Sequence, residues 1–201
     1  AGWRAVNDHP VMRWLLPMTI ITNFVWGLVF VIGIPLLVNT DFGGNPRLYG
    51  YILAAYGIGN VLSNLWLGGL TVRRRAFVMF GGLVILGVGF VLMGIAPTPL
   101  LAMLGAFVAA IGGPMDDIML LLYVQEDFAD STIGKVYSLR IVLSEIGYAL
   151  GVGSAAVIYR VVSTPTGIAI GGLLLMACGL LGWGRFGLEV YQPHLDVTAG
   201  D

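Results

Sequence analysis

The chain has 201 residues, of which 58% are hydrophobic and 10% are charged, and its formal net charge is −1. Soluble domains usually have about 25% charged residues, so this composition excludes an ordinary water-facing surface and indicates lipid as the solvent. The balanced charge gives no sign of a nucleic-acid partner, and the single cysteine, Cys178, has no partner for a disulfide.

Six apolar runs along the chain are long enough to cross a bilayer, for which a helix needs about 20 mainly apolar residues. The predicted spans are 15–38, 49–71, 77–96, 100–124, 136–162 and 167–187. Turn-forming residues such as Gly43, Gly44 and Pro97 lie in the short connections. We therefore predict an N-terminal cytoplasmic segment (1–14), a six-helix transmembrane domain (15–187) and a polar cytoplasmic tail (188–201).

The triplet Arg73, Arg74 and Arg75 between the second and third spans indicates the orientation. With both termini in the cytoplasm, eight Lys and Arg residues lie inside and two outside. The inner set is Arg4, Arg13, Arg73, Arg74, Arg75, Lys135, Arg140 and Arg185, and the outer set is Arg47 and Arg160. The positive-inside rule thus predicts a multi-pass protein of the inner (plasma) membrane with cytoplasmic ends. For the triplet itself we expect a role in topology, with conformational gating as the alternative.

Polar residues are concentrated in the first, second, fourth and fifth spans. They are Thr19, Thr22, Asn23 and Trp26, then Tyr56, Asn60, Ser63 and Asn64, then Asp116 and Asp117, and finally Arg140, Ser144, Glu145 and Tyr148. The third and sixth spans carry essentially none, so we expect them to face lipid on most sides. Two polar spans followed by one span without polar residues therefore occur twice along the chain. This order predicts an all-α polytopic membrane protein of two inverted three-helix repeats.

The polar groups of the four spans converge on one depth. At about 1.5 Å per residue, Asn60 lies near mid-membrane. Within roughly 10 Å of it toward the cytoplasm lie Asn23, Asn64, Asp116, Asp117 and Glu145. This predicts a substrate cavity lined by Asn23, Trp26, Tyr56, Asn60, Asn64 and Tyr148. Two alternatives stay open: the asparagines hydrogen-bond between helices, and Trp26, Phe30 and Tyr56 only pack instead of forming a recognition wall.

Three acids at this depth, Asp116, Asp117 and Glu145, are candidates for proton coupling, because ionisable groups inside a membrane often mark proton paths. Structural pairing is the alternative, with Arg140 as a possible partner. Successive helical residues point about 100° apart, so at most one of the two aspartates is expected to aim squarely into the cavity.

Small residues predict two features of the backbone. The face of the fifth span roughly opposite Glu145 resembles a packing seam, formed by Gly147, Gly151, Ser154 and Ala155. In the fourth span, Pro114 follows Gly112 and Gly113, and we expect it to loosen the helix there. That position is interpreted as a hinge or as a tolerated kink.

Four short motifs stand out along the chain: Asn7-Asp8-His9-Pro10-Val11-Met12-Arg13, the run from Tyr49 to Gly59 (YGYILAAYGIG), Gly68-Gly69-Leu70, and Gly134-Lys135-Val136-Tyr137-Ser138-Leu139. Together they resemble the C-terminal six-helix half of a major facilitator superfamily transporter, of the bacterial branch that exports siderophores and macrolides. The resemblance covers nearly the whole chain. It implies that the first, second, fourth and fifth spans surround a central cavity while the third and sixth stand outside. One departure is that Gly68 to Arg75 contains no acid, so a charge-relay gate is not expected at that loop.

These observations predict one half of a secondary transporter that moves small amphipathic molecules, most plausibly outward in exchange for protons. Its partners would be the substrate, the lipid bilayer, and an N-terminal six-helix half or a second copy. We expect no cofactor, no metal and no enzymatic activity. The spacing of residues suggests no metal site, and the lack of a phosphate-binding loop disfavours an ATP-driven pump. The alternatives are an intramembrane enzyme that uses paired carboxylates, disfavoured because adjacent aspartates cannot face each other, and a six-helix channel.

Overall fold

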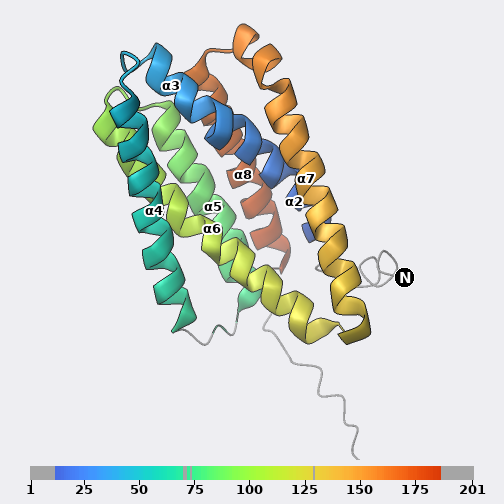
Figure 1. The fold of residues 1–201 in the computed structure, drawn as a ribbon. Helices are drawn as coiled ribbons and strands as arrows, with labels where there is room; N and C mark the ends of the chain where they lie inside the picture. The colour runs from blue at the N-terminus through green and yellow to red at the C-terminus, as the bar shows by residue number, and fades with distance from the viewer. Residues whose placement is uncertain (1–11, 70–71, 73, 129, 187–201) are drawn as a thin grey trace, which may run out of the picture.

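The structure is a computed structural model that describes residues 12–69, 72, 74–128 and 130–186. Its elements in chain order are α2 (Met12–Val25), η1 (Trp26–Gly33), α3 (Ile34–Thr40), α4 (Pro46–Gly68), α5 (Arg75–Gly94), α6 (Pro99–Asp127), α7 (Asp130–Val161) and α8 (Thr164–Phe186). Every described element is helical, and the long helices lie side by side with their connections at the two ends (Figure 1). The predicted all-α class is therefore confirmed, and each predicted span coincides with one helical stretch apart from a few residues at its ends.

Five of these helical stretches are long and apolar enough to cross a membrane. The first is the continuous stretch α2–η1–α3, Met12–Thr40, and the others correspond to α5, α6, α7 and α8. The 23-residue helix α4 is long enough, but its stripe of tyrosine and asparagine side chains lowers its apolar character. The number of spans that hydropathy supports within the described residues is thus five, and α4 is the long helix that falls short of the required hydropathy.

The first span is not a regular α-helix, because its middle is the π-helix η1. In η1 the bonding runs from residue i+5 to residue i, as in the hydrogen bond that Ile34 N–H donates to Val29 O. Pro35 follows directly and has no N–H to donate. Neither pattern of hydrogen bonds can therefore run unbroken past Pro35, and the π-helix ends two residues earlier, at Gly33.

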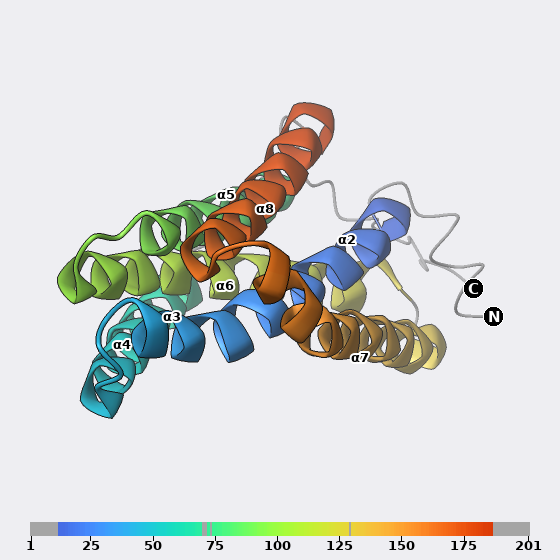
Figure 2. The same ribbon diagram turned by 90° about the horizontal axis from the view of Figure 1, so that it is seen from above.

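Helix α5 packs closely between α6 and α8 (Figure 2). Glycines allow this approach: a Cβ built on Gly112 of α6 would lie 2.2 Å from Gly82 O of α5. At the other contact, a Cβ on Gly87 of α5 would lie 2.5 Å from Gly172 O of α8. The expectation that the third span faces lipid on most sides is therefore wrong. Its lack of polar groups serves close helix packing rather than exposure.

Helix α7 packs mainly against α2 and η1, and makes few contacts with α6. The predicted seam is confirmed, since a Cβ on Gly147 would lie 2.3 Å from Ile20 O and one on Gly151 2.2 Å from Phe24 O. The bundle thus consists of two groups. The first contains α4, α5, α6 and α8, and the second contains α2, η1, α3 and α7.

Two apolar cores hold these groups together at the two ends of the bundle. One centres on residues such as Met12, Phe80 and Tyr123, and the other on Ile34, Phe90 and residues around them. Asn23, Asn60 and Asn64 of the predicted cavity belong to neither core, whereas Trp26 and Tyr56 pack against the second one. The three asparagines lie between the two groups of helices.

Candidate functional site

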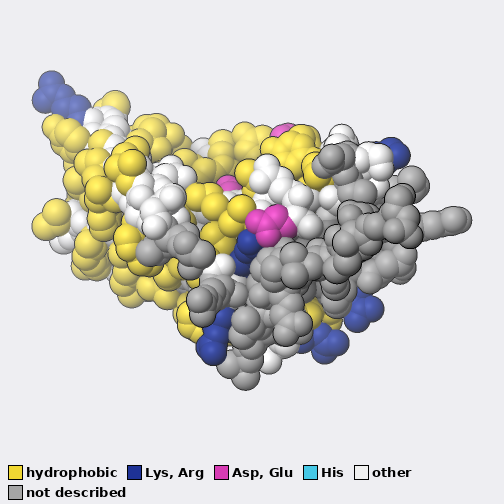
Figure 3. Space-filling view, turned by 90° about the horizontal axis from the view of Figure 1, so that it is seen from below, with side chains coloured by type: hydrophobic (Ala, Val, Ile, Leu, Met, Phe, Trp, Pro, Cys, Tyr) yellow, Lys and Arg dark blue, Asp and Glu magenta, His cyan; other side chains and the backbone are white. Residues whose placement is uncertain are grey.

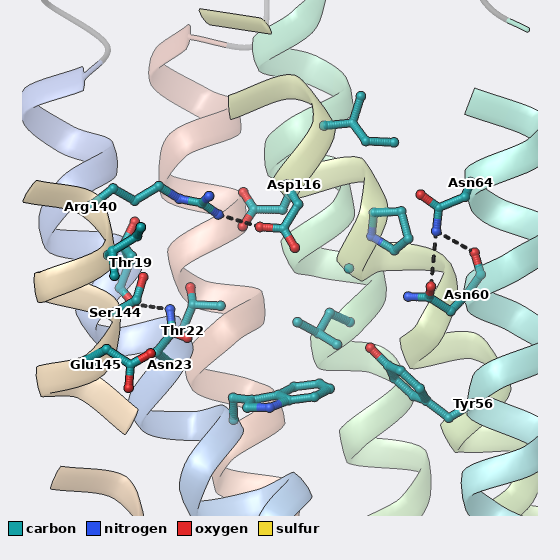
Figure 4. A pocket seen from close by; sticks show the side chains of 17 residues that line it. Thr19, Thr22, Asn23, Tyr56, Asn60, Asn64, Asp116, Arg140, Ser144 and Glu145 are labelled. Carbon is teal, nitrogen blue, oxygen red and sulfur yellow. Dashed lines mark hydrogen bonds and ion pairs between the residues drawn. The ribbon is translucent and has the colours of Figure 1, made fainter. Parts of the chain in front are cut away.

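A cavity of about 540 Å³ opens between the two groups of helices. Its walls come from α2, η1, α4, α6 and α7, with one residue from α5 (Figure 4). The lining residues are Thr19, Thr22, Asn23, Trp26, Tyr56, Asn60, Asn64, Leu86, Gly113, Pro114, Asp116, Asp117, Ile118, Arg140, Ile141, Ser144 and Glu145. The four polar spans therefore meet at one site, although they are far apart in the sequence.

The asparagines of the cavity are held by their own helices. Asn23 Nδ2 donates to Thr19 O at 2.9 Å within α2. Asn64 Nδ2 donates to Asn60 O at 2.8 Å and to Asn60 Oδ1 at 3.0 Å within α4. For Asn23 and Asn64 the structure thus shows hydrogen bonds within one helix instead of between helices. The i, i+4 spacing satisfies these two side chains locally and fixes their position at the cavity wall.

An aromatic group forms one end of the cavity. The rings of Trp26 and Phe30 are stacked, with centroids 4.0 Å apart and an interplanar angle of 10°. Tyr56 of α4 lies 5.6 Å from Trp26 and 4.7 Å from Phe30, tilted against both. Trp26 and Tyr56 line the cavity, whereas Phe30 supports them from behind. Both open interpretations, packing and a wall that a substrate can contact, agree with this arrangement.

Arg140 of α7 forms an ion pair with Asp117 of α6. The Asp117 side chain is 69% exposed and that of Arg140 is 19% exposed, so the pair spans the cavity at its open side. Both aspartates line the cavity, because α6 borders it on two sides of the helix, from Gly113 to Ile118. That at most one of them aims squarely into the cavity stays a prediction.

Glu145 lies on the α7 wall and is exposed to the cavity (Figure 4). No described side chain makes a hydrogen bond or an ion pair with its carboxyl group. Tyr148, in contrast, does not line the cavity: it is half-buried one turn further along α7, and its backbone carbonyl lies against Gly27 of η1. The predicted substrate contact of Tyr148 therefore has no support in the shape of the site.

Ser63, a member of the polar stripe of α4, points away from the cavity. It is buried, and its Oγ donates to Ile111 O of α6 at 2.8 Å. Ile111 lies three residues before Pro114 in α6. The bond ties α4 to the part of α6 just ahead of the proline, and α6 continues as a helix through Pro114.

Charged residues also meet at the end of the bundle where α5 begins and α6 ends. Arg75 is largely buried and its Nη2 contacts both carboxylate oxygens of Glu126, at 2.9 and 2.8 Å. Viewed from this end, basic and acidic side chains lie beside apolar side chains of the described residues (Figure 3). Arg74 is exposed, and Arg73 lies outside the described residues. Arg75 therefore has a structural partner in addition to the topological role predicted for the triplet, and that partner comes from α6 instead of from the loop.

Metal chemistry finds no support in the described residues, among which no three His, Cys, Asp or Glu side chains are grouped to hold an ion. His9 and His194 lie outside the described part of the chain. Cys178 is buried and free.

Sequence reasoning did not identify the apolar members of the lining. Leu86 comes from a span without polar residues, and Ile118 and Ile141 are ordinary apolar helix residues. Glu126 was also missed, because its partner is 51 positions away. The only available signal was helical spacing, which places Ile141 on the same face of α7 as Glu145.

Comparison with known proteins gives one match. The family model described as Major Facilitator Superfamily matches residues 15–200, which is nearly the whole chain. No curated protein and no solved structure matches the chain.

Proposed function

The chain belongs to the major facilitator superfamily, and from this membership we propose that it forms one half of a secondary active transporter that moves small amphipathic molecules by alternating access. In this proposal all six long helices, α4 included, cross the inner membrane as two inverted three-helix repeats, and both chain ends are cytoplasmic. Residues 1–14 and 188–201 are then cytoplasmic segments.

The observation that carries the proposal is the cavity between the two groups of helices. It combines apolar and aromatic walls with a few polar and charged side chains, which is the usual composition of a small-molecule site. Apart from Leu86 of α5, its lining comes from the spans that the superfamily resemblance assigns to the transport path. A site shared by several helices can change shape when those helices move relative to one another, as alternating access requires.

Proton exchange is supported by the balance of charge in the cavity. Three carboxyl groups, Asp116, Asp117 and Glu145, face one guanidinium, that of Arg140, which pairs with Asp117. Asp116 and Glu145 are left as the groups that can take up and release a proton, or attract a cationic group of a substrate. We propose that one of these two couples outward transport to proton entry.

A partner is supported by the exposed faces of α4 and α7. Both helices border the cavity, and both present large apolar side chains away from the bundle, including Ile58 and Leu65 on α4 and Leu150 and Val157 on α7. We propose that an N-terminal six-helix half or a second copy covers these faces and supplies the other wall of the cavity.

The contacts favour neither alternative. An enzyme with paired carboxylates needs two acids that share a water molecule or proton, whereas Asp117 is engaged by a guanidinium. A channel needs a continuous aqueous path, whereas the aromatic group of Trp26, Phe30 and Tyr56 forms one end of the cavity.

Everted membrane vesicles from cells that produce the protein test the proposal. A pH gradient, acid inside, should drive saturable uptake of a radiolabelled macrolide or siderophore. Asp116→Asn or Glu145→Gln should reduce the gradient-driven part at least tenfold, about 1.4 kcal/mol in the coupled step. Asp41→Asn, in the α3–α4 turn away from the cavity, is the matched control and should transport normally.

Other results of this experiment would each contradict a specific part of the proposal. Gradient-driven uptake that is undiminished in the Asp116, Asp117 and Glu145 variants alike rejects proton coupling through these three acids. Uptake that never saturates indicates a channel, and chemical conversion of the compound in detergent indicates an enzyme.

A further inference from the structure

The π-helix η1 lies directly beside the cavity and has to be held in place by other parts of the molecule. A π-helix bonds less favourably than an α-helix, and such segments are usually single turns found at functional sites. Here it extends over eight residues, Trp26–Gly33. Its first residue, Trp26, lines the cavity, and Phe30, one turn on, stacks on it. The direction of these two rings therefore depends on the π-type bonding of η1.

One side chain from another helix bonds to the backbone of η1. Tyr159 of α7 donates its hydroxyl proton to Leu28 O at 3.0 Å. The partners are 131 positions apart in the sequence. A carbonyl oxygen has two lone pairs, so Leu28 O can accept this bond in addition to one from its own helix.

Glycines let α7 and η1 approach at both ends of the π-helix. A Cβ on Gly33 would lie 2.5 Å from the Tyr159 hydroxyl, and one on Gly27 would lie 2.7 Å from Tyr148 O. A side chain at position 33 would therefore displace the hydroxyl from Leu28 O. The sequence of η1 thus leaves room for the tyrosine that bonds to it.

From these contacts we propose that Tyr159 is a positioning residue for the cavity: through its hydrogen bond to Leu28 O it keeps η1 in the π-helical form, and so places Trp26 and Phe30 against Tyr56. The proposal rests on the proposed function in one respect, namely that the cavity is the transport site. Tyr159 itself does not line that cavity. It acts from the far side of η1.

The test uses the full-length protein with Trp26 as its only tryptophan, the other four being replaced by Phe. Tyr159→Phe keeps the ring and removes only the hydroxyl. A neutral hydrogen bond shifts a local equilibrium by about fivefold. We therefore expect amide hydrogen exchange across residues 26–34 to rise by about that factor and quenching of Trp26 by acrylamide to increase. Tyr137→Phe, the same change at an exposed position of α7, should alter neither.

A second variant keeps the test decisive. Gly33→Ala should produce the same two changes in the parent protein, but should add little in the Tyr159→Phe background, where the opposing hydroxyl is gone. Unchanged exchange and quenching in Tyr159→Phe would overturn the proposal, and so would a full additional effect of Gly33→Ala in the double variant. Neither hydrogen exchange nor Trp26 quenching needs a substrate. The proposed role of Tyr159 can therefore hold even if the protein does not transport, and it can fail even if the protein does.

Discussion

At the scale of single residues, the ion pair between Asp117 and Arg140 is a direct link between two helices that otherwise make few contacts. It joins α6 of one group to α7 of the other across the open side of the cavity. Because Asp117 is largely exposed, water screens the pair and its net contribution is modest, roughly 0.5–1 kcal/mol. Its position gives it more influence on how the two groups are spaced than on the overall stability.

A double-mutant cycle measures this link. Arg140→Gln and Asp117→Asn should each lower the free energy of unfolding in detergent, and the double variant should lose less than the sum, with a coupling of about 0.5–1 kcal/mol. Arg160→Gln is the control, since no ion pair of Arg160 occurs in the described residues. Strict additivity of the two changes would show that the pair has no energetic role.

Which residues form the cavity could be predicted in part from the sequence. Asn23, Trp26, Tyr56, Asn60, Asn64 and the three acids line it, because polar groups in an apolar helix avoid lipid and must point inward. Tyr148 was misplaced, because its position depends on how α7 meets η1. Leu86 was missed because an apolar residue gives no such signal. The role of each residue in transport stays a prediction.

At the scale of helices, the contact between α5 and α6 depends on paired glycines. Gly112→Ala would place a Cβ 2.2 Å from Gly82 O, a backbone atom that cannot move aside alone. We expect this change to lower the unfolding free energy by about 1–3 kcal/mol, the usual cost of overpacking. Unfolding by denaturant in detergent, followed by circular dichroism, measures it.

Gly184→Ala in α8 is the matched control for that substitution. No atom lies within 4 Å of a Cβ at this position, and alanine favours a helix over glycine by about 0.5–1 kcal/mol. The control should therefore be neutral or stabilising. Equal losses in the two variants would mean that helix packing is not the cause.

The positions of the helices followed from the apolar runs, whereas their internal form and neighbours did not. The π-helix η1 was not predicted, since it depends on Pro35 and on Tyr159 from a distant part of the chain. The burial of α5 was not predicted either, because a run of apolar residues and glycine is compatible with lipid and with a packed helix alike.

At the scale of the whole molecule, the proposed topology places the α3–α4 and α7–α8 turns on one side of the membrane and the start of α7 on the other. With Cys178 replaced by Ala, single cysteines at Asp41 and Ser163 should react with an impermeant thiol reagent from outside intact cells. A cysteine at Ser131 should react only in everted vesicles. Labelling of Ser131 and Asp41 from the same side would contradict the topology.

The proposed partner interface can be tested with two leucines of similar exposure. Leu65 on α4 is 72% exposed and Leu181 on α8 is 69% exposed. We expect Leu65→Asn to weaken association, because α4 borders the cavity, and Leu181→Asn to leave it intact. Cross-linking in membranes followed by size-exclusion chromatography compares them. Equal effects of the two changes would argue against an interface on α4.

Because the two groups of helices pack sparsely beside the cavity, the molecule resists deformation less across the cavity than within each group. Each group is stiff, since glycine contacts lock α5 to α6 and α8, and α7 to α2. Beside the cavity the two groups touch little, because α6 and α7 make few contacts there, although the two apolar cores join the groups at either end. A molecule that fills the space adds contacts at the middle of the bundle, where the two groups have few of their own. Binding of a molecule in the cavity should therefore stiffen the whole bundle, even where no helix moves far.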